Sequence, residues 1–269
     1  MVPSVLRVVV VLYRSRLRTV RSVLEAIAAA KIDAPVVVNV VVNRDRSEWR
    51  RSAPRRLRVA DRVAMEVWLQ DNHGGVASAY NFVIARGDPA DVMIILDADS
   101  RMPPDYFTEV WSLRESLRAG LAFASPELFS GSLRISPYRL AGIVPGAIEG
   151  PLARGQPLRF ASGIGVINAG LAGAISAFRR IDGFSARIGL DLSDVAWSLQ
   201  AARAQAELTL LSTNHTHHLS IRTRGFGLPR LRKYLAACWR LATDTRDFRG
   251  GLRLMSRGVR AARWQRQPT

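Results

Sequence analysis

Apolar runs without polar alternation are separated by helix-like segments in the first half of the chain, and this pattern constrains the fold most strongly. The runs 5–12, 35–42 and 91–96 are rich in valine or isoleucine, which is typical of strands buried on both faces of a sheet. Segment 16–30 has apolar residues at helical spacing, and segment 103–118 starts with proline, as helices often do. The alternation predicts an α/β fold with a mixed, mostly parallel sheet flanked by helices.

The rest of the chain is expected to be less regular and to end in a basic extension. Two further strands are expected at 66–69 and 121–126, with a polar loop at 43–58 and a turn at 71–75 that leads into a helix at 76–85. Later segments predict a loop or lid at 130–157, a strand-like stretch at 160–168, helices at 173–180 and 192–205, a strand at 208–212, and basic amphipathic helices at 229–243 and 252–264. We therefore expect a main domain over residues 1–227 and a helical extension over 228–269.

Composition predicts a globular protein, and a reducing, cytoplasmic setting is the default expectation. Hydrophobic residues make up 48% and the mean hydropathy is +0.03, so the chain is not a disordered one. The one cysteine, Cys238, excludes an internal disulfide. The longest apolar runs fall well short of the roughly 20 residues of a membrane span, and no secretory pattern opens the sequence.

The net charge of +17 comes almost entirely from arginine and favours anionic partners. Positive charge is concentrated after Pro229, where apolar residues at helical spacing lie between the arginines. Two interpretations of this extension stay open: packing on the main domain, or peripheral docking on the anionic inner face of the plasma membrane. Nucleic acid is not expected as a partner, because the chain lacks a recognised motif and its aromatic residues do not interleave with the basic runs.

Two carboxylates, Asp97 and Asp99, follow the buried run 91–96 directly. They would project from the carboxyl end of a strand, where ligands bind in open α/β sheets. Hard oxygen ligands suit a divalent cation that bridges to phosphates. The alternative is a solvated turn in which an aspartate caps the following helix.

Other polar clusters follow the other expected strands. The carboxyl ends of parallel strands meet at one edge, so these clusters could share a cleft. They comprise Tyr13-Arg14, Asn43-Arg44-Asp45, and Asn214 with His215, His217 and His218. Three histidines within four residues suggest a metal-ligand role as strongly as a structural one.

A further acidic pair, Asp191 and Asp194, opens the expected helix at 192–205. The pair suits helix capping, and one carboxylate could instead act as a general base. Neither G-x-G-x-x-G nor the P-loop pattern occurs, which argues against a dinucleotide enzyme and a P-loop NTPase.

Three stretches in the order 71–107, 167–199 and 215–220 resemble one known family. They read DNHGGVASAYNFVIARGDPADVMIILDADSRMPPDYF, INAGLAGAISAFRRIDGFSARIGLDLSDVAWSL and HTHHLS. The chain resembles family-2 glycosyltransferases of the GT-A fold, and among them the rhamnosyltransferase-like bacterial enzymes, over roughly residues 5–240. The resemblance implies a GT-A catalytic domain over 1–227.

The resemblance also implies roles for individual residues. Asp99 would bind the metal, with His217 or alternatively His218 completing its coordination, and the metal would be Mg²⁺ or Mn²⁺. Asp194 matches the catalytic base and Asp191 its motif partner. On the donor side the matching residues are Tyr13 at the nucleotide base, Asn43 or Asp45 where the family has an aspartate, Asn81 on the donor-side helix, and Asp97 at the ribose or metal.

The implied activity is metal-dependent inverting transfer of a sugar from a nucleotide-sugar donor, with dTDP-rhamnose a candidate. The acceptor would be a glycan or lipid-linked glycan in bacterial surface polysaccharide synthesis. Departures from the family pattern at Asn43, Ala196 and Gln200 leave one alternative, a catalytically impaired homologue that acts as a binding protein. The positive charge alone leaves a second, less favoured one, a basic nucleic-acid-binding protein. A haloacid-dehalogenase-like phosphatase is disfavoured, because only Lys233 could supply its late lysine.

Overall fold

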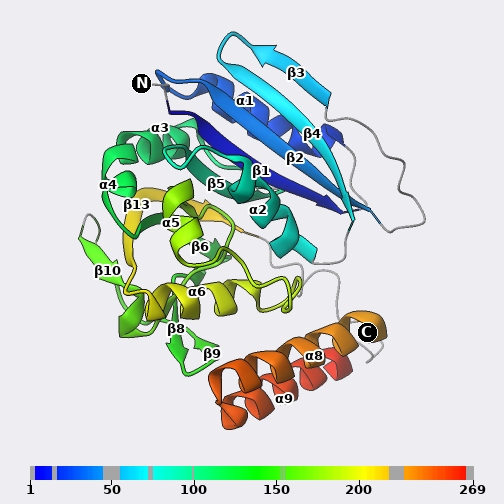
Figure 1. Ribbon diagram of the computed structural model, residues 1–269. Helices are drawn as coiled ribbons and strands as arrows, with labels where there is room; N and C mark the ends of the chain where they lie inside the picture. Colours follow the sequence, from blue (N-terminus) through cyan, green and yellow to red (C-terminus); the bar gives the residue numbers. More distant parts are fainter. Residues whose placement is uncertain are drawn as a thin grey trace.

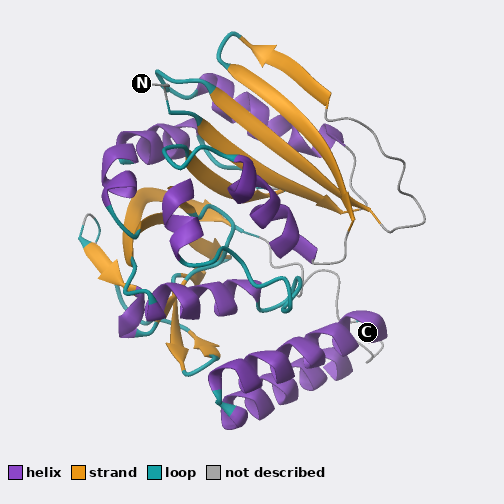
Figure 2. Cartoon of the chain, viewed as in Figure 1, coloured by secondary structure: helices purple, strands orange, loops and turns teal. Residues whose placement is uncertain are grey.

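The computed structural model describes residues 4–13, 17–44, 55–71, 75–98, 100–152, 154, 156–217 and 227–264. A large twisted sheet runs through the molecule with helices on both of its faces, and a pair of long helices lies beside its lower end (Figure 1). Figure 2 shows the same alternation of helices and strands along the chain. The predicted α/β class is confirmed.

The main sheet has the strand order β10-β13-β6-β12-β5-β1-β2-β4-β3, with β7 paired to β6. Its strands are β1 (Leu6–Tyr13), β2 (Val36–Arg44), β3 (Arg55–Ala60), β4 (Val63–Asp71), β5 (Val92–Asp97), β6 (Ala122–Ser130), β7 (Leu133–Ser136), β10 (Pro157–Arg159), β12 (Ala172–Ala174) and β13 (Glu207–Thr216). Strands β5, β1, β2 and β4 are parallel neighbours, and β13 is parallel to β6. Because β12 is antiparallel to both β5 and β6, the two parallel groups point the same way and their carboxyl ends share one edge.

The valine-rich strands form the centre of the core because both of their faces are covered. Val8 and Val10 of β1 pack on the side of α1 (Arg21–Ala29) and α3 (Pro104–Ser112), and Val9 packs on the opposite side. That opposite side is covered by α2 (Gly75–Arg86), α5 (Ile175–Arg180) and α6 (Ser193–Arg203). The absence of polar alternation in these strands is thus explained by burial on both faces.

Shorter elements complete the main part of the chain. They are the 3-10 turns η1 (Leu17–Val20) and η4 (Phe160–Ser162), helix α4 (Arg114–Ala119), and a small sheet of β8 (Tyr138–Ala141), β9 (Val144–Gly146) and β11 (Ile164–Gly165). The expected loop or lid at 130–157 is wrong in part, because β7, β8 and β9 lie within it. The expected loop at 43–58 likewise gives way to β3 at Arg55. Each of these strands pairs with a nearby partner, which overrides its weak local pattern.

The basic extension forms a hairpin of two helices, α8 (Leu228–Thr245) and α9 (Phe248–Trp264). Tyr234, Cys238 and Leu241 of α8 share a buried cluster with Ile143 and Val195 of the main part of the chain. The first interpretation, packing on the main domain, therefore holds for this face of the hairpin. None of the described helices combines the length and apolar character needed to cross a membrane.

Candidate active site

The carboxyl ends of β1, β2 and β5 bring three of the predicted donor-side residues to one edge of the sheet. Tyr13 and Asn43 are paired neighbours in the β1–β2 register, and Asp97 pairs with Val11 of β1. The Tyr13 side chain is 45% exposed there. This clustering follows from parallel pairing, as the sequence predicted.

His217 lies at the same edge but follows β13, a strand in the other half of the sheet. It follows β13 directly, and its backbone N–H donates to the carbonyl of Phe129 in β6. This contact holds its imidazole, only 9% exposed, with Nε2 3.5 Å from Oδ2 of Asp97. The structure therefore brings the Asp97 and His217 side chains together, as expected for groups that share a ligand.

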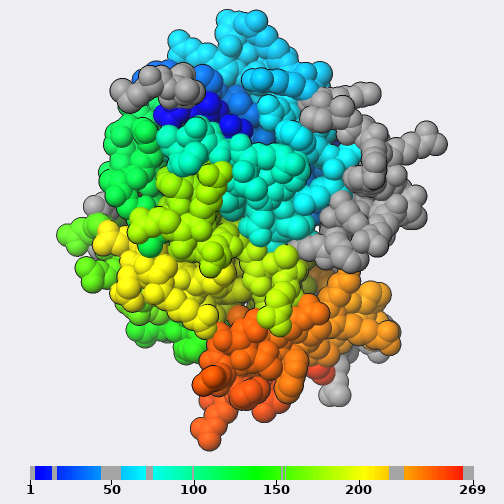
Figure 3. All heavy atoms as spheres, viewed as in Figure 1, coloured from blue at the N-terminus to red at the C-terminus, as the bar shows by residue number. Residues whose placement is uncertain are grey.

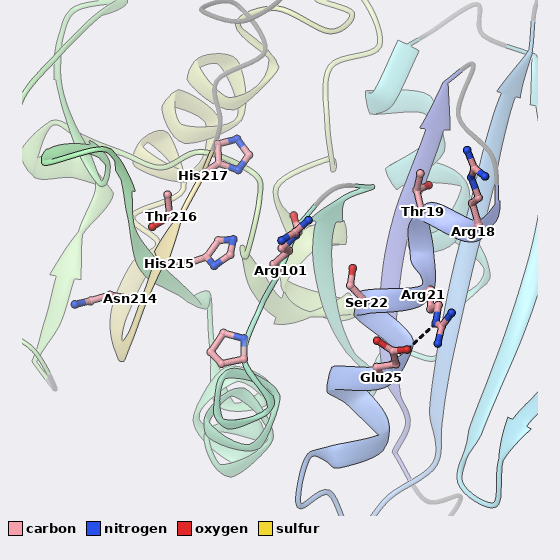
Figure 4. Close-up of a pocket in the computed structure, with 12 residues that line it drawn as sticks. Arg18, Thr19, Arg21, Ser22, Glu25, Arg101, Asn214, His215, Thr216 and His217 are labelled. Atoms are coloured by element: carbon pink, nitrogen blue, oxygen red, sulfur yellow. Dashed lines mark hydrogen bonds and ion pairs between the residues drawn. The ribbon is translucent and has the colours of Figure 1, made fainter.

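An open cleft of about 1090 Å³ lies next to this pair, between α1 and the end of β13 (Figure 4). His215 points toward Arg101, which lies in the middle of this view, and His217 lies above His215. Arg18, Arg21 and Arg101 line the cleft and Glu25, which bonds Arg21 at 2.7 Å, is the acidic residue among the lining. The cleft is therefore suited to an anionic ligand.

The Asp191–Asp194 segment is shaped by an unusual backbone conformation. Leu192 has a φ of 66°, in the left-handed region that favours glycine, and it directly precedes α6. Such conformations in non-glycine residues are costly and often occur at functional sites. The turn separates the two carboxylates: Asp191 points toward α8, whereas Asp194 accepts a hydrogen bond from the Val195 N–H at 2.9 Å.

Neither carboxylate occupies the N-cap position, which is Leu192 and makes no side-chain cap hydrogen bond, although Asp194 does accept the first-turn N–H of Val195. The general-base interpretation gains from the environment of Asp194. The pKa of Asp194 is raised to about 6, chiefly by burial; the backbone N–H groups of Val195 and Asp194 act against this rise, and the charges of Asp191 and Asp97 add to it. A carboxylate of that acidity can take up a proton near neutral pH.

Tyr80 of α2 is a buried residue that the sequence did not single out. Burial raises the pKa of its phenol well above the usual value, and the charges of Asp97 and then Asp194 raise it further. Tyr80 thus lies within electrostatic range of both carboxylates and stays protonated. Tyr80 therefore lies between the neighbourhoods of the two carboxylates.

Arg230 of α8 is a second residue that sequence reasoning missed. Its guanidinium bonds both carboxylate oxygens of Asp191, at 2.8 and 3.4 Å, and the Asp191 side chain is 10% exposed. A surplus of arginine in the extension was the only signal that could have suggested such a partner. The pair ties the helical hairpin to the segment that carries Asp194.

The two candidate asparagines differ in what their amides contact. Asn81 donates to the carbonyl of Phe184 at 2.7 Å and accepts from its N–H at 2.8 Å, so its amide braces a turn, and its role on the donor side stays a prediction. Asn43 donates to the Gly75 carbonyl at 3.0 Å, while its buried Oδ1 has no hydrogen-bond partner among the described residues. An unsatisfied buried acceptor is unusual and is explained if a ligand N–H occupies it.

Three predicted site residues, Asp45, Asp99 and His218, lie outside the described part of the chain. Within that part, no cluster of three or more histidine, cysteine, aspartate or glutamate residues is placed to hold a metal ion. The predicted metal set is therefore represented in the structure only by His217, with Asp97 as its neighbour.

The sequence matches no protein-family model and no curated protein. Solved structures of similar fold do exist. S. aureus TarS has a TM-score of 0.57 at 9% identity over 89% of this chain, and GalNAc-T7 with UDP, GalNAc and Mn²⁺ has a TM-score of 0.57 at 11% identity over 90%. TarS residues 1–349 in complex with UDP-GlcNAc give a TM-score of 0.53 at 9% identity over 94% of this chain.

The similarity covers only part of these proteins. The chain spans 39% of the TarS chain and 48% of the GalNAc-T7 chain. At such low identity the likeness concerns the fold. The described chain has the GT-A fold that these solved glycosyltransferases share, with Asp97 and His217 at the carboxyl edge of its sheet.

Proposed function

We propose that this protein is a glycosyltransferase that moves a sugar from a nucleotide-sugar donor to a hydroxyl of a glycan or lipid-linked glycan acceptor, with inversion. The observation that carries the proposal is the arrangement of two unlike carboxylates. Asp97 lies exposed beside His217 at the strand edge, and Asp194 is half-buried with a pKa of about 6. One group is suited to the charged donor and the other to proton transfer.

The donor would lie across the carboxyl ends of β1, β2 and β5. Tyr13 offers an exposed aromatic ring there, and Asn43 Oδ1 offers a buried acceptor to an N–H of the nucleotide base. The arginine-lined cleft beside His217 favours the phosphates or an anionic acceptor. UDP and UDP-GlcNAc are bound by the similar structures, so UDP-sugars are the first donors to test. dTDP-rhamnose is tested beside them because the sequence resemblance suggests it.

The residues present fit a divalent cation. Ligand atoms at right angles around Mg²⁺ are about 3 Å apart, because each lies 2.0–2.1 Å from the ion. Asp97 Oδ2 and His217 Nε2, at 3.5 Å, are close to that separation, and a carboxylate with an imidazole suits Mn²⁺ as well. Asp97 and His217, together with Asp99, would hold the cation, which when bound would supply positive charge against the donor diphosphate.

The reaction requires one proton to be removed from the acceptor. The acceptor oxygen forms a bond to the anomeric carbon from the face opposite the diphosphate, and the bond from that carbon to the phosphate oxygen breaks. Asp194 takes the hydroxyl proton, while Asp191 is bound to Arg230. The electron pair leaves with the nucleoside diphosphate.

Calorimetric titration of the full chain with UDP, dTDP, UDP-GlcNAc and dTDP-rhamnose, with and without Mn²⁺, tests the donor half of the proposal. We expect one nucleotide class to bind and its affinity to rise with Mn²⁺. Release of free sugar from the bound donor, with water as a slow acceptor, then tests catalysis. Binding without any release or transfer would favour the catalytically impaired alternative, and no nucleotide binding at all would contradict the proposal.

A further inference from the structure

The helical hairpin has an outer face that differs from its packed inner face. Tyr234, Cys238, Leu241 and Leu254 are buried against the main part of the chain. Figure 3 shows the hairpin as a lobe at the bottom of the molecule in this view, below the sheet and its covering helices. Packing thus uses only part of the apolar surface of α8 and α9.

Four large apolar side chains of the hairpin remain exposed, and we call them the outer apolar strip. They are Leu228 (56% exposed), Trp239 (56%), Phe248 (50%) and Leu252 (66%). Leu228 and Trp239 are three helical turns apart on α8, and Phe248 and Leu252 are one turn apart on α9. The Trp239 and Phe248 rings lie 6.1 Å apart, so the strip is continuous from one helix to the other.

Positive charge surrounds the strip, and the nearby acidic groups are turned to other partners. Exposed arginines alternate with the strip residues along the hairpin: Arg232, Arg249, Arg253 and Arg260. Asp244 and Asp247 are the acidic residues of the hairpin sequence. Asp247 accepts bonds from the Ile143 and Gly250 N–H groups, and Asp244 lies 3.5 Å from Arg187.

The strip begins next to the candidate active site. The bond from Arg230 to Asp191 places the first turn of α8, with Leu228, beside the segment that carries Leu190. Leu190 is itself 56% exposed. An apolar surface bound here would therefore lie close to Asp194.

We propose that the outer apolar strip docks on the surface of an anionic phospholipid bilayer. Trp239, Phe248 and Leu252 would sit at the level of the headgroups, and the flanking arginines would contact lipid phosphates. An apolar strip with aromatic residues and arginine flanks is the composition of interfacial helices, and lipid phosphate complements its charge. The proposal concerns the hairpin alone and does not require the proposed sugar transfer.

Flotation of the full chain with vesicles tests this surface without any substrate. Vesicles of pure phosphatidylcholine are compared with equal mixtures of phosphatidylcholine and phosphatidylglycerol. We expect the chain to float with the mixed vesicles and to bind the neutral ones at least tenfold more weakly. Equal partitioning into both, or none into either, would overturn the proposal.

Paired variants separate the apolar from the electrostatic contribution. Trp239→Gln with Leu252→Gln should lower partitioning by about tenfold or more, because the variant loses two apolar side chains that the bilayer would bury. Arg249→Gln with Arg253→Gln should lower it about 25-fold, since each basic residue near an anionic surface contributes roughly a factor of five. The matched controls are Leu57→Gln with Leu133→Gln and Arg180→Gln with Arg203→Gln, which change exposed residues of the same kinds elsewhere.

The outcome for the variants decides between lipid and other occupants. Wild-type partitioning by the controls, with losses in both hairpin variants, supports lipid docking. Unchanged partitioning of the Trp239→Gln, Leu252→Gln variant contradicts it. Sedimentation analysis of the same samples measures self-association. If the wild-type chain self-associates without binding vesicles, and the Trp239→Gln, Leu252→Gln variant does not self-associate, the strip would be assigned to a second copy of this chain.

Discussion

Asp97 and Asp194 are carboxylates in opposite environments. Asp97 is 45% exposed at the end of a buried strand, beside an imidazole and an arginine-lined cleft. Asp194 lies in the first turn of α6, just after Leu192 with its positive φ, and burial is the main cause that raises its pKa to about 6. The difference shows how one fold can assign charge binding and proton transfer to the same residue type, by exposure and neighbours alone.

The largest effect is expected from Asp194→Asn. An amide of the same shape cannot accept the acceptor proton, so turnover should fall by about 10²–10⁴. Nucleotide affinity should stay near wild type, because Asp97 and His217 are untouched. Initial rates of sugar transfer or donor hydrolysis, together with calorimetric affinity, check this. Near-normal turnover would remove Asp194 from the mechanism.

Asp97→Asn and His217→Gln are expected to give the reverse pattern. Each should weaken Mn²⁺-dependent nucleotide binding on the order of ten- to hundredfold, as the loss of groups at a metal site does. The pKa of Asp194 should change little in these variants, because burial is the largest cause of its rise. Titration with nucleoside diphosphate in the presence and absence of Mn²⁺ measures this. Asp105→Asn, an exposed aspartate on α3, is the matched control, and equal losses in the control would contradict a local role.

Asp194→Asn should also change the stability of the fold in a pH-dependent way. The folded pKa of Asp194, about 6, lies above its ordinary value of 3.8. Its stabilising contribution is therefore complete below pH 3.8 and is lost as pH rises through 6, where a buried charge forms. The asparagine variant should thus be more stable than wild type above pH 6, by about 1–3 kcal/mol of unfolding free energy in urea titrations. A variant less stable at pH 8 than wild type would show that this carboxylate is not destabilised by burial.

Arg230→Gln should give the smallest effect on rate, roughly tenfold or less, because Arg230 acts through Asp191. Loss of the guanidinium leaves the Asp191 charge uncompensated, which should raise the pKa of Asp194 and shift the pH–rate profile to higher pH. Arg230→Lys should restore the profile in part. The charged and titratable groups that face Asp194 are Asp191, Asp97, Tyr80 and Tyr138. Because the variant leaves Asp97 and His217 untouched, nucleotide affinity should stay unchanged. A lower rate with an unshifted profile would mean that Arg230 is only structural.

Much of the central fold could be predicted because its pattern is local. β1, β2 and β5 are buried on both faces and therefore lack polar alternation, and their parallel pairing brings their ends together. The segments around β7, β8 and β9 could not be predicted in the same way. These strands are three or four residues long and are stabilised by pairing that a local window does not contain.

The candidate site was predictable to a similar extent. The meeting of Asp97 and His217 follows from strand ends, although 120 positions separate them in the sequence. The positive φ of Leu192 could not be read from the sequence, since leucine rarely adopts it. The Arg230–Asp191 pair was hidden for a different reason: the basic extension offered many arginines, and only the packing of α8 selects one.

The pH dependence of kcat/KM for the wild-type protein tests most directly whether Asp97 and Asp194 have the separate roles proposed for them. This quantity reports the ionisation of the free enzyme, and a general base acts only when deprotonated. The predicted result is a rate that falls on the acid side with a midpoint near pH 6, the pKa of Asp194, in a profile that Arg230→Gln moves upward. A midpoint near pH 4, as for an ordinary exposed aspartate, would contradict the assignment of Asp194 as the base.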